Sequence, residues 1–140
     1  MAADLVRADR LFAGVPYAYA SIAQPGALVF TAGACPLDEN GKLAGAGDVR
    51  LQAFQAMANL AHALSAAGAG LTGVLKTTVF VASGDRGDLV AAWDVVRAAF
   101  GEHDAPSTLL GVAALGYVGQ LVEIEAVAVA GDARCLRGEP

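Results

Sequence analysis

Two glutamates near the end of the chain, Glu123 and Glu125, are the residues whose type and spacing point most directly to chemistry. Side chains alternate between the two faces of a strand, so a strand over 121–130 places both carboxylates on one face with Leu121 and Val127. Burying an unpaired charge costs free energy, so this face must meet water, a cation or a ligand. Two interpretations follow: a half-solvated sheet face, or a carboxylate presented to a cleft.

Turn and capping residues divide the rest of the chain into the segments that must position this face. Asp48 can cap a helix that Gly68 ends. Apolar runs bounded by Gly, Pro or an Asn-Gly pair are typical of strands. In chain order we expect a short edge strand over 5–11, strands over 17–22 and 27–33, a helix over 48–67, a strand over 73–82, a helix over 88–100, and strands over 108–114 and 121–130.

Both predicted helices are amphipathic. Apolar residues recur every three or four positions, so one stripe of each helix is expected to face a core. The expected stripes are Leu51, Phe54, Met57, Leu60 and Leu64 in the first helix, and Leu89, Trp93, Val96 and Phe100 in the second. The order β-β-β-α-β-α-β-β predicts an α+β fold in which two helices cover one face of a mixed sheet.

The other face of that sheet would stay uncovered. Besides the two glutamates, the period of two places Lys76, Thr78 and Phe80 on it. We expect Lys76 to pair with Glu125, within or between subunits. A face that mixes charged and large apolar residues predicts burial against another copy of the protein.

The composition is that of one apolar, acidic domain. A length of 140 residues predicts a single domain over 1–130, followed by a loose C-terminal tail over 131–140. Hydrophobic residues make up 56% of the chain, yet no run is long enough to span a membrane, so the surplus apolar surface again favours subunit contacts. A net charge of -5, with nine scattered Lys and Arg residues, argues against nucleic acid as a partner.

The two cysteines, Cys35 and Cys135, lie far apart, and no His or Cys stands at ligand spacing from either, so no metal site is indicated. We expect free thiols in a reducing compartment, with Cys35 a buried structural thiol because no base lies near it in the sequence. His62 is expected on the surface. The first residues have neither the cationic flank nor the apolar stretch of a signal peptide, which favours a cytoplasmic location.

Five segments together resemble the Rid superfamily, also called YjgF or L-PSP proteins. In this order and spacing they are specific, although each alone is weak: Pro16-Tyr17, Leu28-Val-Phe-Thr-Ala-Gly33 with Pro36-Leu-Asp38, Val74-Leu-Lys-Thr-Thr-Val-Phe-Val81, Phe100-Gly-Glu-His103 and Val122-Glu-Ile-Glu-Ala126. The resemblance implies a chorismate-mutase-like protomer and a homotrimer whose sheets form a barrel, with clefts for small-molecule ligands between neighbouring subunits.

The best-known activity of the superfamily is hydrolysis of reactive enamines and imines, such as 2-aminoacrylate, to a keto acid and ammonia, without a metal or organic cofactor. The chemistry needs a positioned water and a group that moves protons, which a carboxyl group can be when a partly dry cleft raises its pKa toward neutrality. The resemblance implies that Glu123 is this catalytic group. It implies a substrate-binding set of Tyr17, Ala32, Gly33, Trp93, Ser107, Thr108, Leu109, Leu110 and Tyr117.

The sequence departs from the superfamily at its polar anchors. Ala105-Pro-Ser-Thr108 replaces a Pro-Ala-Arg-Ser segment, so Thr108, or Ser107 if the next turn carries an insertion, stands where an arginine would hold the substrate carboxylate. Ala32 replaces a serine, and Trp93 replaces a cleft-facing asparagine. A hydroxyl hydrogen bond contributes about 1 kcal/mol and a bidentate charged pair at least about twice that, so simple 2-imino acids are expected to be poor substrates.

Two residues keep two interpretations each: Trp93 either walls the cleft or packs in the core, and Tyr117 either covers the ligand mouth or anchors its loop.

Three functions follow for the protein. It is an enzyme acting on another small imine, enamine or amide, or a trimer that binds a neutral metabolite without turnover, or an endoribonuclease. The absence of a basic patch and of a histidine pair makes the third the least supported, and the presence of both Glu123 and Tyr17 favours the first.

Overall fold

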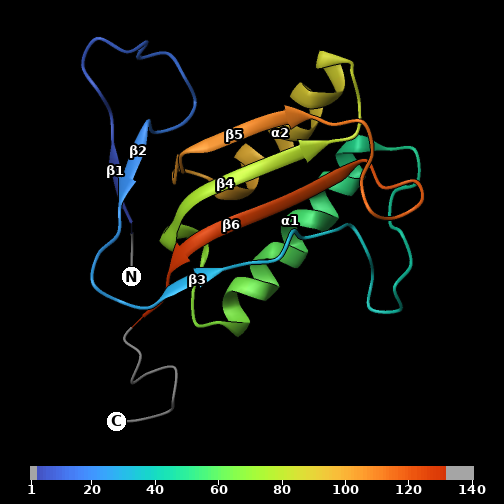
Figure 1. Cartoon of the computed structure of the whole chain (residues 1–140), viewed down its shortest axis with the longest axis horizontal. Coiled ribbons are helices and arrows are strands. Elements are labelled where there is room, and N and C mark those ends of the chain that lie inside the picture. Colours follow the sequence, from blue (N-terminus) through green and yellow to red (C-terminus); the bar gives the residue numbers. More distant parts are fainter. Residues whose placement is uncertain (1–2, 132–140) are drawn as a thin grey trace.

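A four-stranded mixed sheet carries both long helices on one face (Figure 1). The computed structural model describes residues 3–131. The main elements are β3 (Leu28–Phe30), α1 (Val49–Ala66), β4 (Val74–Val81), α2 (Arg86–Phe100), β5 (Ser107–Gly111) and β6 (Val122–Val129), with a short 3-10 turn at Leu71–Gly73. The strand order is β3-β6-β4-β5, in which only the β4–β5 pair is parallel. The predicted α+β fold and element order are therefore confirmed.

The first two strands form a small sheet of their own. β1 (Asp4–Val6) pairs antiparallel with β2 (Ala20–Ile22) beside one end of the main sheet. The expected strands over 5–11 and 17–22 are present but much shorter, and the first pairs with the second instead of forming an edge of the main sheet. The Ser21 hydroxyl donates to the Leu75 carbonyl at 2.6 Å and so attaches this hairpin to β4. Of the tail expected over 131–140, residues 132–140 lie outside the described range.

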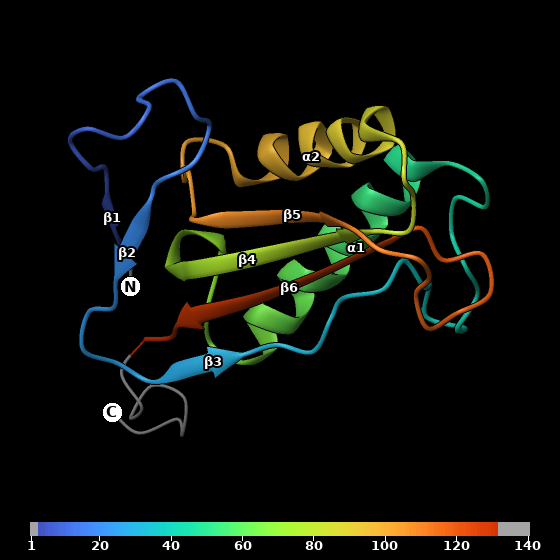
Figure 2. The ribbon, with the colours of Figure 1, turned by 45° about the horizontal axis from the view of Figure 1, so that its top comes forward.

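Acidic residues cap both helices. The Asp48 carboxylate accepts a hydrogen bond from the Leu51 amide at 3.0 Å, as the sequence predicted. Asp85 does the same for the Gly87 amide at 2.8 Å, so α2 begins at Arg86, two residues earlier than expected. Figure 2 shows α2 lying along β5 and β4, while α1 lies behind β6.

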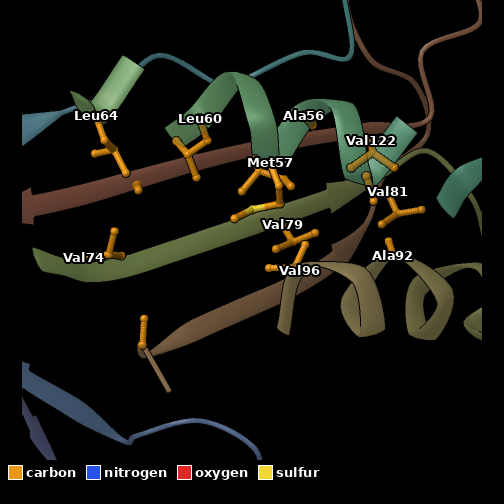
Figure 3. Packing of buried hydrophobic residues seen from close by; sticks show 14 of the residues in the cluster. Ala56, Met57, Leu60, Leu64, Val74, Val79, Val81, Ala92, Val96 and Val122 are labelled. Atoms are coloured by element: carbon orange, nitrogen blue, oxygen red, sulfur yellow. The ribbon is translucent and has the colours of Figure 1, made fainter. Parts of the chain in front are cut away.

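The core lies between the helices and the sheet. Met57, Leu60 and Leu64 of α1 and Val96 of α2 are buried against Val79 of β4 and its neighbours (Figure 3). Side chains such as Ala53, Ala56 and Ala92 are also completely buried, and their small size lets the two helices approach the sheet closely. This is the packing that the amphipathic pattern predicted in outline.

The predicted stripe of α1 is wrong in its first turns. Leu51 is 57% exposed and Phe54 is 69% exposed, because the helical period continues back from Met57 to Ala53 instead. Gln52 is completely buried beside it. Its amide donates to the Gly45 and Gly119 carbonyls and accepts from the Leu121 amide, which satisfies a buried polar group and fixes the rotation of α1.

The second face of the sheet is not covered by any helix of residues 3–131 (Figure 1). The burial pattern of β6 alternates as predicted: Val122, Ile124, Ala126 and Ala128 are buried under the helices, while Glu123 and Glu125 point to the other side. Phe80 of β4 stands beside Glu123 in the register. We call this surface the open face. It exposes large apolar side chains, with Phe30 72% and Leu110 43% exposed.

The two leucines of α1 provide a direct test of this packing. Leu60→Ala is expected to lower the free energy of unfolding by about 2–5 kcal/mol, because it leaves a cavity in a fully buried site. Leu51→Ala, the matched control, should change it by less than about 1 kcal/mol. Urea denaturation of both variants checks the prediction, and similar losses in the two would contradict the observed rotation of α1.

Candidate functional site

A cavity of about 440 Å³ opens along β5, the edge strand of the main sheet. Its volume is in the range of small-molecule sites. Within residues 3–131, five residues line it, all of them among those expected to bind substrate: Tyr17, Trp93, Ser107, Thr108 and Leu109. The structure therefore brings together side chains from β5, from α2 and from the segment that precedes β2.

An ion pair holds the Tyr17 segment against the turn before β5. The Arg7 guanidinium donates to the Tyr17 carbonyl and forms an ion pair with the Asp104 carboxylate at 2.8 Å. The Ala18 amide donates to the Asp104 carbonyl at 2.8 Å. The Tyr17 ring packs edge-to-face on Tyr19, with centroids 5.9 Å apart. The two contacts to Asp104 link segments far apart in the sequence, and together with the local contacts of Tyr17 they position one wall of the cavity.

Trp93 serves both of the roles that the sequence left open. It lines the cavity and also packs, partly buried, on the edge of the hydrophobic core. Trp93 thus gives the cavity a large apolar wall that the core keeps in place.

The two hydroxyls of β5 have different partners. Ser107 donates to the Ala105 carbonyl at 2.8 Å and lies 2.7 Å from the hydroxyl of the buried Thr77. Thr108 accepts a hydrogen bond from the Lys76 ammonium at 2.5 Å. The expected pairing of Lys76 with Glu125 is therefore not present within this chain: both line one hollow of the open face, but the ammonium reaches across to β5.

Glu123 belongs to a separate cluster. It lies on β6, two strands from β5 and hence roughly 10 Å from it, and it does not line the cavity of one chain. Its Oε1 atom accepts hydrogen bonds from the Cys35 thiol at 3.1 Å and from the Gln120 amide at 3.3 Å. Glu123 is half-buried there.

Gly33 makes room for this carboxylate. A methyl group at residue 33 would lie 2.4 Å from Glu123 Oε2, well inside contact distance. The segment that contains Gly33 runs beside β6, because the Ala34 amide and carbonyl both pair with Ile124. The place of Gly33 next to the carboxylate therefore has a steric reason, which does not depend on any ligand.

Cys35 is held by the first helix. The Asn59 amide of α1 donates to the Cys35 and Leu37 carbonyls, each at 2.8 Å. Burial, then the hydrogen bond to Glu123, raises the pKa of the Cys35 thiol to about 11. The thiol is therefore protonated at neutral pH and acts as a donor to Glu123, which agrees with the expectation that it is not a nucleophile.

Sequence reasoning did not find the contacts of Cys35, Gln120 and Asn59 with this cluster. Cys35 and Glu123 are 88 residues apart, and no local pattern signals that they meet. Gln120 is almost completely buried, and its position directly before the Glu123 strand was the only available signal. A buried amide beside a predicted carboxylate has to find partners, and here the carboxylate is one of them.

Besides Gly33, three of the expected binding residues lie outside the cavity. Ala32 is exposed after β3, Leu110 is exposed on the open face, and Tyr117 is exposed in the loop before β6, where its amide donates to the Gln120 side chain. No group of three or more His, Cys, Asp or Glu within residues 3–131 could hold a metal ion. None of the helices described there is both long and apolar enough to cross a membrane.

The fold and this arrangement define a small α+β protein with a cavity at its edge strand and a glutamate on its open face. Residues 9–130 match the family model described as endoribonuclease L-PSP. A RutC family protein from Synechocystis is 40% identical over 102 residues, which cover 72% of this chain and 77% of that protein. The chain therefore belongs to the Rid/L-PSP superfamily.

Solved structures show the same fold. A Rid family protein of unknown function from Yersinia pestis is 29% identical and superposes with a TM-score of 0.85, over 92% of this chain and 99% of that one. The TdcF protein of Escherichia coli, solved with bound serine, is 28% identical with a TM-score of 0.65, over 91% of this chain and 99% of that one.

The raised pKa of Cys35 can be measured by alkylation in a Cys135→Ser background, where Cys35 is the sole thiol. Because only the thiolate reacts, the rate should still rise about tenfold per pH unit between pH 8 and 10, whereas a thiol at the ordinary value of 9.0 would begin to level off. Glu123→Gln removes a charge that opposes the thiolate and should move the profile to lower pH. Glu125→Gln is the control and should leave it unchanged; levelling near pH 9 in the parent would contradict the contact.

Proposed function

We propose that this protein is a cofactor-free hydrolase that acts on the C=N bond of a small imine or enamine other than the simple 2-imino acids, in a cleft between subunits. The proposal rests on one observation: within one chain, the cavity and the Glu123 carboxylate lie apart. The residues of 3–131 that line the cavity at β5 supply walls and hydroxyls but no carboxyl, imidazole or amino group, while the carboxylate of the half-buried Glu123 lies two strands away on the open face.

A homotrimer would complete this site. The open face exposes Phe30 and Leu110, and Phe80 lies on it beside Glu123. These side chains form a large apolar surface for a small monomer. Burial of these faces against neighbouring copies would remove that surface from water. In such an assembly the Glu123 cluster of one subunit can border the cavity of the next.

The Glu123 cluster suits a proton-transfer role. Cys35 and Gln120 both donate to Oε1, and within residues 3–131 no hydrogen bond to Oε2 is present, so one oxygen is positioned and the other remains available. In hydrolysis, the carboxyl group would donate a proton to the imine nitrogen, and water would attack the carbon. The carboxylate would then accept a proton from that water, which gives a carbinolamine. It would pass this proton to the nitrogen and take up the hydroxyl proton as the C–N bond breaks, so that ammonia or an amine leaves and a carbonyl forms.

The cavity favours a ligand larger than 2-aminoacrylate. TdcF, with the same fold, holds an amino acid, which supports a metabolite of similar or somewhat larger size here. This chain offers hydroxyls where the superfamily offers a guanidinium, and it adds the apolar walls of Trp93 and Leu109. Affinity would therefore depend more on apolar contact and less on a bidentate carboxylate contact.

Binding without turnover is the alternative that the same cavity allows. Ribonuclease activity, which the family name carries, has less support. The net charge is -5, His103 is engaged with the Val74 carbonyl at 2.8 Å, and His62 is exposed on α1, so no histidine lines the cavity. Neither an acid-base pair nor a phosphate-binding surface is assembled within residues 3–131.

The proposed assembly has a matched pair of test variants. Light scattering of the wild type at micromolar concentration should give about three times the chain mass of 14.1 kDa. Phe30→Glu, on the open face, should lower this mass, because a charge would be buried between subunits. Phe54→Glu, equally exposed but on the helical side, should not. A monomeric wild type, or equal behaviour of the two variants, would rule out assembly through the open face.

Catalysis is tested with a panel of imines and enamines with and without a carboxylate, with semicarbazide competition for 2-aminoacrylate. We expect slow turnover of 2-aminoacrylate and faster turnover of a bulkier substrate. Glu123→Gln should reduce kcat by about 100-fold or more, the usual contribution of a proton-transfer group. Glu125→Gln should stay within a few-fold of the wild type.

Three outcomes would overturn parts of this proposal. Full activity in Glu123→Gln would exclude the carboxylate as the proton-transfer group. Ligand binding without turnover of any substrate, unchanged by Glu123→Gln, would establish the binding protein instead. Rates on 2-aminoacrylate that equal those of arginine-bearing relatives and are unaffected by Thr108→Ala would refute the substrate assignment.

A further inference from the structure

Lys76 connects the open face to the cavity. It stands two residues before Thr78, which lies opposite Thr108 in the parallel β4–β5 pair, so Lys76 and Thr108 share a face of the sheet. The half-buried ammonium of Lys76 lies 2.5 Å from Thr108 Oγ1. Among residues 3–131, no carboxylate forms an ion pair with it within 4.0 Å.

The Lys76 contact fixes the direction of the Thr108 hydroxyl. An ammonium group has three donors and no acceptor, so the Thr108 oxygen must accept and its own proton must point elsewhere. No acceptor for that proton is present among the described residues, and Thr108 lines the cavity. The hydroxyl is thus free to donate to a ligand, and the neighbouring positive charge strengthens that donor.

Ser107 differs from Thr108 in this respect. Its proton goes to the Ala105 carbonyl, and its oxygen lies 2.7 Å from the Thr77 hydroxyl. Thr77 is completely buried, and the Ser107 oxygen is the one acceptor available to its proton among the described residues, so Ser107 accepts from Thr77. Ser107 therefore offers a ligand at most an acceptor lone pair.

We infer that Lys76, acting through Thr108, is the positioning residue that selects the ligands of the cavity. The selected ligands have an acceptor oxygen, of a carboxylate or a carbonyl, attached to an aromatic or other bulky apolar body that packs on Trp93 and Leu109. The inference rests on the proposed function only in taking the cavity as the ligand site. One donor backed by one charge is weaker than a bidentate guanidinium, so small imino acids without such a body remain poor ligands.

Three probes with the same aromatic body test this: phenylacetate, phenylacetamide and 2-phenylethylamine, titrated against the full-length protein by NMR. The wild type should bind phenylacetate at least about tenfold more tightly than the amine, with the amide between them, because a charge-assisted hydrogen bond contributes about 1.5–3 kcal/mol. Lys76→Met should abolish this preference by weakening the carboxylate and not the amine. Lys76→Arg, which keeps the cation, should restore most of it.

Two variants of β5 separate the hydroxyls. Thr108→Val is nearly isosteric and should abolish the preference as Lys76→Met does, and it decides the question if Lys76→Met fails to fold. Ser107→Ala removes the other hydroxyl of the cavity. It should change the affinity of all three probes by the same factor, so that the preference is retained. Circular dichroism and light scattering show whether each variant keeps the fold and mass of the wild type.

The outcomes distinguish this inference from the proposed function. If phenylacetate and the amine bind equally well, or if the preference survives Lys76→Met and Thr108→Val, the role of Lys76 is refuted while the cavity remains a ligand site. Loss of the preference in Ser107→Ala would show that the Ser107 hydroxyl, and not that of Thr108, binds the ligand oxygen. That result would also refute the role of Lys76. If none of the probes perturbs the signals of cavity residues, the cavity is not a ligand site, and the proposed function fails together with the inference.

Discussion

β6 lies in the interior of the main sheet, and its alternating side chains create two different environments in the protomer. On one side, apolar residues pack under α1 and α2 and provide most of the burial that stabilises the fold. On the other, Glu123 and Glu125 stand on a face that no helix of residues 3–131 covers. A charged group cannot be buried without partners, so this alternation places the candidate catalytic group on the face that is left uncovered.

The surroundings of Glu123 show how the fold satisfies such a group. Gly33 leaves the space, Cys35 and Gln120 supply the donors, and Asn59 of α1 holds the backbone of Cys35 in place. The helix on the covered side of the sheet thereby positions a carboxylate on the uncovered side. Because the Cys35 thiol has a raised pKa of about 11, it is a donor at neutral pH and adds no charge of its own.

The proposed site would recognise a ligand differently from an arginine-bearing site. A guanidinium binds a carboxylate directly through two parallel hydrogen bonds. In this chain the cation beside β5 is Lys76, on the neighbouring strand, and its ammonium donates to the Thr108 hydroxyl. In the proposed site this charge would act through one directed donor, and Trp93 would supply an apolar wall. Selectivity would then depend less on charge and more on shape.

The order of elements, the α+β fold, the cap at Asp48 and the two faces of β6 could be predicted from the sequence, because local periodicity and turn chemistry determine them. Superfamily membership could be predicted as well, since five short segments keep their order and spacing. The rotation of α1 was predicted wrongly. The apolar pattern placed Leu51 and Phe54 toward the core, but a buried glutamine hydrogen-bonded to two loops fixes the rotation and leaves both side chains exposed. The same limit applies to the site. The contact of Cys35 with Glu123, the different partners of the Ser107 and Thr108 hydroxyls, and the reach of Lys76 to β5 all depend on hydrogen bonds between residues far apart in the chain. Only the tertiary structure decides which donors meet which acceptors.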